Sequence, residues 1–187
     1  AAVIRDIIRN IGADLQLGGG IRSFEDASGW LDLGIDRVIL GTSAVREPEL
    51  LTRLAEQFGS ERIIGSVDAR QGRIAVEGWV KTGGDYVHWA RRFGGAGAGF
   101  LLYTNVDVEG LQRGVVLDPI VRLIGAVHTP VIVAGGISGR SDVTELKAIG
   151  AYGVVLSSAL YSGRLPLRDA LEAADEDRGN ISPDKRD

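Results

Sequence analysis

The chain repeats part of its own sequence at a distance of 116 residues. The segment 33–42 (LGIDRVILGT) falls on 149–158 (IGAYGVVLSS), and the same shift places the Gly-Gly-Ile of 19–21 on that of 135–137. Asp26 falls on Asp142. A repeat of this length predicts two similar βαβ segments, each with Gly-Gly-Ile after one strand and a turn of small residues after the next.

Short β-branched runs alternate with longer amphipathic stretches, a pattern that predicts an α/β fold with a parallel sheet. We expect strands at 15–18, 37–41, 62–68, 100–104, 130–134 and 152–157. We expect helices at 3–11, 24–33, 47–58, 86–96, 117–127, 142–149 and 167–174, with Ser23 and Ser141 as N-caps. Residues 1–174 then form one domain, and the charged segment 175–187 is expected to be a disordered tail.

Composition excludes several classes of function. The formal net charge is −4 without a Lys/Arg cluster, which argues against nucleic acid or an anionic membrane as the main partner. The absence of cysteine excludes disulfides, thiolate metal sites and a cysteine nucleophile, and two histidines leave little for a metal site. No apolar run is long enough for a membrane helix or a signal peptide, so we expect a cytoplasmic protein.

Both Gly-Gly pairs directly follow an expected strand, where backbone N–H groups can face an anion at a helix N-terminus. The first candidate phosphate cradle comprises Gly19, Gly20, Arg22, Gly41 and Thr42, and the second comprises Gly135, Gly136, Ser138, Ser157 and Ser158. A single pair equally fits tight packing of a strand against a helix. The repetition favours phosphate, and two cradles on opposite sides of a ring of strands fit a substrate with a phosphate at each end.

Candidate catalytic residues stand where strands of a barrel end. Asp68 ends one strand and Thr104 another, although an aspartate can also cap a turn and a threonine hydroxyl can bond a neighbouring backbone. Glu109, before a glycine in the next loop, is a candidate acid or base, or a solvated loop residue. Trp79 lies in a hairpin-like excursion after Asp68, where it can stack on a heterocycle or pack against the barrel rim.

Five segments in order carry a family resemblance: LQLGGGIRSFED, DRVILGTSAV, VDARQGRIAVEGW, YTNVDVEG and VIVAGGIS. The chain, up to about Ala174, resembles the isomerase family of histidine biosynthesis that acts on the bisphosphorylated ribotide ProFAR. The resemblance implies a (β/α)8 barrel and an Amadori rearrangement of an aminoaldose to an aminoketose, with no metal or redox cofactor. It also implies that Asp68 and Thr104 are the family's strand-end catalytic residues, and that Trp79 is the aromatic residue near the substrate.

The sequence also departs from the family pattern. In the family, two further βα units come first, and the aspartate proposed as general base lies on the first strand. Here six units are expected. Glu109 and Leu111 replace an aspartate and a threonine, and Ser157 and Ser158 replace a glycine and a basic residue.

Three hypotheses follow. In the first, the protein is an isomerase whose missing strands come from a second polypeptide, a partner subunit such as a homodimer partner or an N-terminal fragment, or an N-terminal segment that precedes this sequence. In the second, it is a catalytically silent relative that binds a sugar phosphate or a protein. In the third, it is a barrel enzyme for another bisphosphate.

Overall fold

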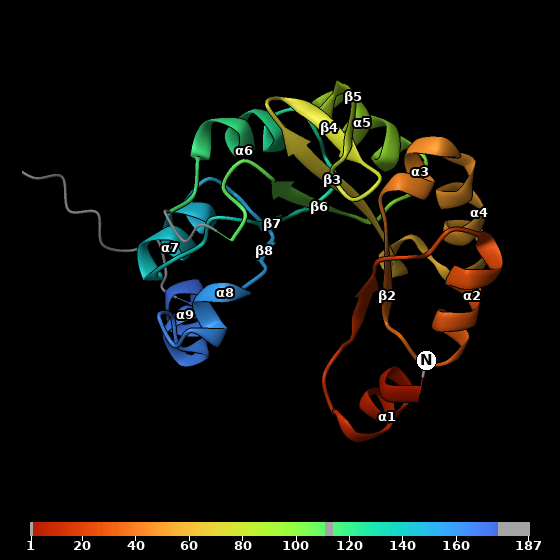
Figure 1. The fold of residues 1–187 in the computed structure, drawn as a ribbon, viewed down its shortest axis with the longest axis horizontal. Helices are drawn as coiled ribbons and strands as arrows, with labels where there is room; N and C mark the ends of the chain where they lie inside the picture. Colours follow the sequence, from red (N-terminus) through yellow and green to blue (C-terminus); the bar gives the residue numbers. More distant parts are fainter. Residues whose placement is uncertain (1, 111–113, 176–187) are drawn as a thin grey trace, which may run out of the picture.

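The computed structural model describes residues 2–110 and 114–175, in which one sheet curves into an open arc (Figure 1). Its parallel strands lie in the order β1-β2-β3-β6-β7-β8, so β1 and β8 are the two ends and do not pair with each other. The bounds are β1 Gln16–Gly18, β2 Arg37–Leu40, β3 Ile63–Arg70, β6 Phe100–Asn105, β7 Val131–Ala134 and β8 Gly153–Val154. The expectation of six parallel strands in a partial barrel is confirmed.

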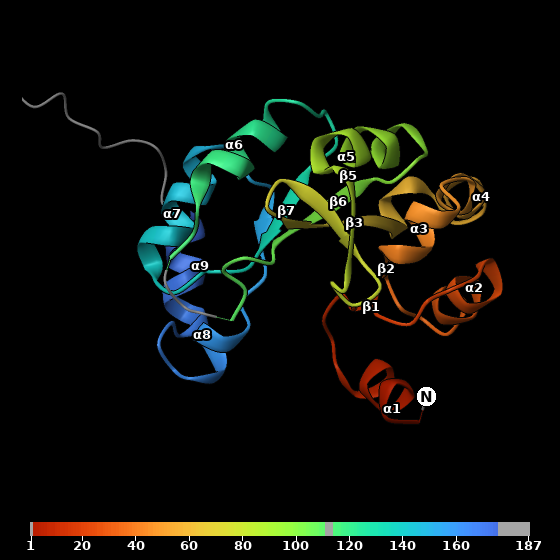
Figure 2. The same cartoon turned by 45° about the horizontal axis from the view of Figure 1, so that its top comes forward.

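The helices lie along the outer side of the arc, with α1 at one end and α8 and α9 at the other (Figures 1 and 2). Their bounds are α1 Ala2–Asn10, α2 Phe24–Asp32, α3 Thr42–Arg46, α4 Glu49–Phe58, α5 Tyr86–Gly95, α6 Leu117–Ile124, α7 Arg140–Ala148, α8 Ser158–Tyr161 and α9 Leu167–Asp175, with a 3-10 turn at Ser60–Arg62. The short helices α3 and α8 were not expected. The segment 176–187, predicted to be a tail, lies outside the described residues.

The N-cap of α2 was predicted correctly and that of α7 was not. The hydroxyl of Ser23 accepts the N–H of Asp26, as an N-cap does. Helix α7 instead begins after Gly139, so Ser141 lies inside its first turn. The carboxylate of Asp142 accepts the N–H of Gly139 and caps the helix from within, which makes a capping hydroxyl at 141 unnecessary.

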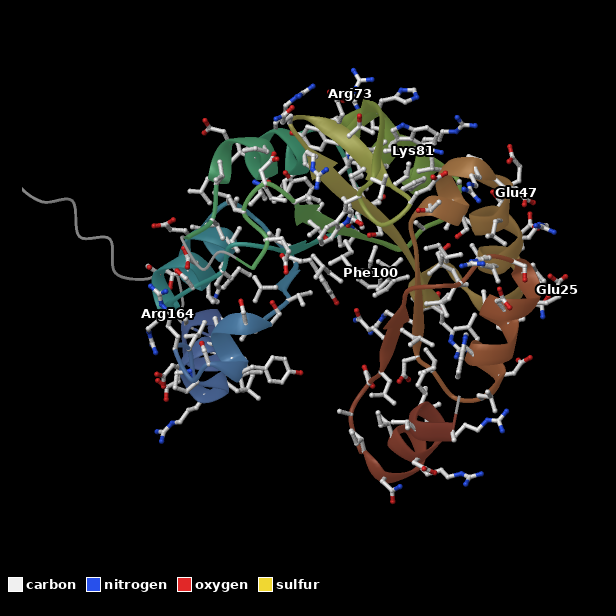
Figure 3. All side chains as sticks on the ribbon, viewed as in Figure 1. Glu25, Glu47, Arg73, Lys81, Phe100 and Arg164 are labelled. Carbon is white, nitrogen blue, oxygen red and sulfur yellow. The ribbon has the colours of Figure 1, made fainter. Side chains whose placement is uncertain are left out.

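The hydrophobic core lies between the sheet and the outer helices. Side chains alternate along a strand, so Val38, Leu40, Leu101 and Val133 face the helices and belong to the core cluster. The opposite face, which includes Ile39, Ile64, Leu102 and Ile132, lines the inner side of the arc and is not part of that cluster. Phe100 also lies on this inner side (Figure 3).

The repeat is reproduced in backbone hydrogen bonds. Three backbone hydrogen bonds of the first segment have a counterpart 116 residues later. The N–H of Ile35 donates to the carbonyl of Trp30, as that of Ala151 does to Leu146. In the same way, Asp36 donates to Leu15 and Tyr152 to Val131, and Val45 donates to Gly41 and Tyr161 to Ser157. The residues before the two short helices also agree, with φ and ψ of −115° and −92° at Gly41 and −120° and −98° at Ser157. The two βαβ segments predicted from the sequence are therefore present.

Large apolar side chains are exposed at both ends of the arc. On α1, Val3 is 71% exposed and Ile7 follows it at helical spacing, while Ile11 is exposed directly after the helix. Beyond β8, Tyr161 is 90% exposed and Leu167 is 54% exposed. A monomeric protein seldom leaves such side chains clustered in contact with water. Both ends of the sheet therefore carry apolar side chains that a further surface can cover.

Candidate active site at the carboxyl ends of the strands

Asp68 and Thr104 are direct neighbours across β3 and β6, where they are paired in the parallel register. Both side chains share the inner face with Ser66, which precedes Asp68 by two residues on β3. The Ser66 hydroxyl donates to Oδ1 of Asp68 at 3.1 Å. The Thr104 side chain forms no hydrogen bond within the described residues, so its hydroxyl is available to a ligand.

Trp79 reaches Asp68 from a hairpin formed by β4 (Arg73–Val76) and β5 (Lys81–Asp85). Its indole N–H donates to Oδ2 of Asp68 at 2.9 Å, and its carbonyl accepts from the guanidinium of Arg70 at 2.9 Å. The predicted hairpin is confirmed, and Trp79 is half-buried. Its backbone has a φ of +68°, an unusual value for a residue other than glycine, so the two hydrogen bonds hold a strained tip in place.

Glu77 fixes the same hairpin to the end of β2. Its N–H donates to the hydroxyl of Thr42 at 2.9 Å, and its carboxylate pairs with Lys81 and Arg46 at 2.9 and 2.8 Å. Figure 2 shows the hairpin extending from β3 over this part of the arc. Hydrogen bonds from Lys81 and then from Arg46 lower the pKa of Glu77, which keeps the carboxylate ionised.

The first glycine turn, residues 19–22 between β1 and α2, is open to solvent. Gly19 and Gly20 have φ of +95° and +73°, and no atom lies within 4 Å of the position that a Cβ would occupy on either. The Gly20 N–H has no acceptor within the described residues, whereas the register of β1 and β2 directs the Gly19 N–H to the Ile39 carbonyl. The Arg22 N–H donates to Oδ2 of Asp26, and the Arg22 side chain is exposed.

The second glycine turn, residues 135–138 between β7 and α7, is covered by the loop that follows β6. Gly136 accepts the N–H of Gly114 at 3.2 Å, and a Cβ on Gly136 would lie 2.5 Å from the Gly114 carbonyl oxygen. Asp142 accepts from Ser138, both from its N–H at 2.7 Å and from its hydroxyl at 2.9 Å, as well as from the Val115 N–H. Glycine at 136 is thus required by the close approach of the loop.

Glu109 lies beside this second turn. Its Oε2 atom is 2.9 Å from the position of a Cβ on Gly135. Within the described residues the Glu109 carboxylate has no hydrogen-bond donor or ion-pair partner and does not bond to Asp68 or Thr104. Leu111, which departs from the family pattern, lies outside the described residues.

The remaining residues of the two candidate cradles also lie at matching places. Gly41 and Thr42 begin α3 after β2, whereas Ser157 and Ser158 begin α8 after β8. The Thr42 hydroxyl already accepts from the hairpin at Glu77. Each set of predicted cradle residues therefore lies at the carboxyl end of its own pair of strands. The first set contacts the hairpin through Thr42, and the second contacts the loop after β6 through Gly136.

Three supporting residues were not predicted from the sequence: Ser66, Arg70 and Glu77. They form hydrogen bonds with Asp68, Trp79 and Thr42, respectively. Ser66 carried a usable signal, because a strand has a period of two and a polar residue two before Asp68 shares its face. Arg70 and Glu77 act through the fold of the hairpin tip, which the sequence does not specify locally.

Two surface cavities lie away from these residues, on the outer helices. One, of about 410 Å³, is lined by Phe24, Arg53, Glu56 and Gln57. The other, of about 270 Å³, lies between α4 and the end of α5. In residues 2–110 and 114–175, no three His, Asp or Glu side chains are grouped so that they could hold a metal ion, and no helix is long and apolar enough to cross a membrane.

The parallel strands form an open ring with the helices outside. Glycine turns follow two of the strands, and a carboxylate stands at the end of a third. These features define a protein of the (β/α)-barrel class. Within that class, the chain belongs to the histidine biosynthesis protein family, whose model matches residues 1–166.

Curated relatives agree with the family assignment. An enzyme of Methanoregula boonei is 56% identical over 172 residues, 92% of this chain and 73% of the relative. One of Methanocorpusculum labreanum is 55% identical over 174 residues, 93% of this chain and 74% of the relative. Both are named 1-(5-phosphoribosyl)-5-((5-phosphoribosylamino)methylideneamino) imidazole-4-carboxamide isomerase. The family predicted from the sequence segments is confirmed.

Proposed function

We propose that the protein is an isomerase that converts the bisphosphorylated aminoaldose ProFAR to its aminoketose by an Amadori rearrangement. The observation that carries the proposal is the identity above 50% to isomerases of this name over more than nine-tenths of the chain. Asp68 and Thr104 support it, because they stand side by side where two neighbouring strands end.

The reaction needs a proton donor at the ribose ring oxygen and a base at C2. In our proposal the Asp68 carboxyl protonates the ring oxygen, the bond from that oxygen to C1 breaks, and C1 forms a double bond to nitrogen. A base then removes the proton from C2, and protonation at C1 with loss of the O2 proton gives the ketose. Thr104 binds the substrate beside Asp68 through its free hydroxyl, and Trp79 stacks on a heterocycle of the substrate.

We assign the two phosphate groups to the two glycine turns. Each turn has two consecutive glycines with positive φ, and the N–H groups of Gly20, Gly135 and Gly136 have no acceptor within the described residues. Such groups are donors for a phosphate, and the α2 and α7 N-termini that follow favour a negative charge. Arg22, Gly41 and Thr42 complete the first site, and Ser138, Ser157 and Ser158 the second.

The C2 base and the closure of the ring are assigned to further βα units, which come from an N-terminal segment of a longer chain or from a partner polypeptide. The two unpaired strands β1 and β8, and the exposed apolar side chains next to them, support this part of the proposal. A small-molecule substrate made in biosynthesis also agrees with a cytoplasmic location.

The test is conversion of ProFAR by the natural assembly, followed by chromatography of the product, for the wild type and Asp68→Asn. The amide keeps the shape of the carboxyl but cannot transfer its proton, so we expect a loss of turnover of at least about a hundredfold with substrate binding preserved. Unchanged turnover in Asp68→Asn removes Asp68 from the mechanism. Tight binding without turnover in the wild type identifies a silent sugar-phosphate-binding relative instead.

A further inference from the structure

The two glycine turns differ in two charged side chains: Arg22 in the first turn, where the second has Ser138, and Glu109 beside the second. Each has an aspartate at the same repeat position, Asp26 in the first and Asp142 in the second, and each aspartate accepts the N–H of the residue four positions earlier. These two carboxylates therefore cannot distinguish the turns from each other. Arg22 attracts phosphate and sulfate alike, so the difference that bears on the kind of anion is Glu109. It lies against Gly135, whereas no described atom lies within 4 Å of the Cβ position at Gly19.

Glu109 also differs from the other acids around the second turn in having free oxygens. Asp142 is buried, and its oxygens accept from Ser138, Gly139 and Val115. Asp107, in the same loop as Glu109, accepts the N–H of Gln71 at 2.8 Å. Glu109 is half-buried and has no donor within the described residues. A carboxylate without a donor can still accept a hydrogen bond, and it repels an anion that has no proton to donate.

The second turn therefore offers opposite groups to one ligand. Within the described residues, the N–H groups of Gly135 and Gly136 are donors without an acceptor, and the Glu109 carboxylate is an acceptor without a donor. Sulfate offers only acceptor oxygens at neutral pH and meets the carboxylate with like charge. A phosphate that carries a proton satisfies both sides, because its P–OH group donates to Glu109 while its other oxygens accept from the two glycines.

We propose that Glu109 makes the second glycine turn selective for a protonated phosphate group over an anion of the same shape that lacks a proton. The proposal rests on the proposed phosphate-binding function of the turns. It gives Glu109 the role of a specificity-determining residue at the second turn. It predicts no such selectivity at the first turn, where no carboxylate of the described residues lies within 4 Å of the Cβ positions of Gly19 and Gly20.

The experiment is an NMR titration of the full chain with inorganic phosphate and, separately, with sulfate at pH 7. The amide resonances of Gly19 and Gly20 report the first turn, and those of Gly135 and Gly136 the second. The test variant is Glu109→Gln, which removes the charge at almost constant shape. The matched control is Asp107→Asn, a neutral replacement in the same loop away from Gly135.

In the wild type we expect the second turn to bind phosphate at least about tenfold more tightly than sulfate, because a hydrogen bond to a charged group is gained with one anion only. The first turn should bind both anions alike. Glu109→Gln should lose most of the preference, and Asp107→Asn should keep it.

Equal affinities for phosphate and sulfate at the second turn of the wild type overturn the selectivity proposal, as does a preference that survives Glu109→Gln. Both results leave the proposed function intact. Absence of either anion from both turns at millimolar concentration overturns the assignment of the turns to phosphate and the selectivity with it.

Discussion

The indole N–H of Trp79 lies 2.9 Å from Oδ2 of Asp68, while Ser66 donates to the other oxygen of the same carboxyl group. Both oxygens of the proposed acid are therefore occupied by side chains of the protein. A substrate oxygen that reaches Asp68 must share one of them or replace a donor, and the hairpin carrying Trp79 is the more exposed of the two supports. The contact links the fold of the hairpin to the chemistry of the site.

A double-mutant cycle should detect this contact in the stability of the chain. Asp68→Ala and Trp79→Phe each remove one partner, and we expect a coupling free energy of about 1 kcal/mol, because the bond joins a neutral donor to a half-buried carboxylate. Urea unfolding of the two single variants and the double variant measures it. The control is Trp30→Phe combined with Asp68→Ala, for which the two losses of unfolding free energy should add. A coupling of zero between Trp79 and Asp68 would show that the bond does not form in solution.

The two glycine turns should respond differently to the same substitution. Gly20→Ala places a methyl group in open space, so its cost is the left-handed backbone alone, about 1 kcal/mol. Gly136→Ala at the matching position would bring a Cβ to 2.5 Å from the Gly114 carbonyl oxygen, and we expect it to cost about 2 kcal/mol more. Thermal or urea unfolding compares them, and equal losses would contradict the close packing of the loop on the second turn.

Acid should release the hairpin before the rest of the fold. Hydrogen bonds from Lys81 and Arg46 hold the pKa of Glu77 below its ordinary value of 4.5. The stabilisation is therefore complete above pH 4.5 and is lost as the pH falls through the lowered pKa. We expect a shift in Trp79 fluorescence in that range, measured in a Trp30→Phe, Trp89→Phe background. Adding Glu77→Gln should abolish the shift, and a shift that persists would assign it to another acid.

Much of the fold followed from local sequence. The β-branched runs and the repeat predicted the parallel strands and the two matching glycine turns, because each depends on residues close in the chain. Helices α3 and α8 were missed because they have only five and four residues, too few for a periodic pattern. Ser141 was the wrong cap because Asp142 performs that function from inside the helix.

The site was less predictable, because its contacts join distant segments. Asp68 and Thr104 were placed together by the rule that parallel strands end at one rim. The bond from Trp79 to Asp68 depends on three successive residues of the hairpin tip with positive φ, which no local pattern indicated. The sequence marked Glu109 as a candidate acid or base that replaces the family's aspartate, but only the fold shows that it lies at Gly135.

The exposed ends of the arc should drive association. Val3 and Ile7 on α1 and Tyr161 on α8 are exposed beside the unpaired strands β1 and β8, and association at these ends would remove them from water. We expect light scattering at micromolar concentration to give a mass of at least twice 19.8 kDa for the isolated chain. Val3→Asp with Ile7→Asp should lower that mass. A well-folded monomer with a cooperative melt would contradict this assembly prediction.

The most direct measurement for the proposed function is calorimetric titration of the natural assembly with ProFAR, with inorganic phosphate as the comparison ligand. Two phosphate sites that bind the ends of one molecule predict one ProFAR per barrel, bound at least about a hundredfold more tightly than inorganic phosphate. Two weak and independent binding events, or a ProFAR affinity no higher than that of phosphate, would contradict the proposal that the two glycine turns hold a single bisphosphorylated substrate.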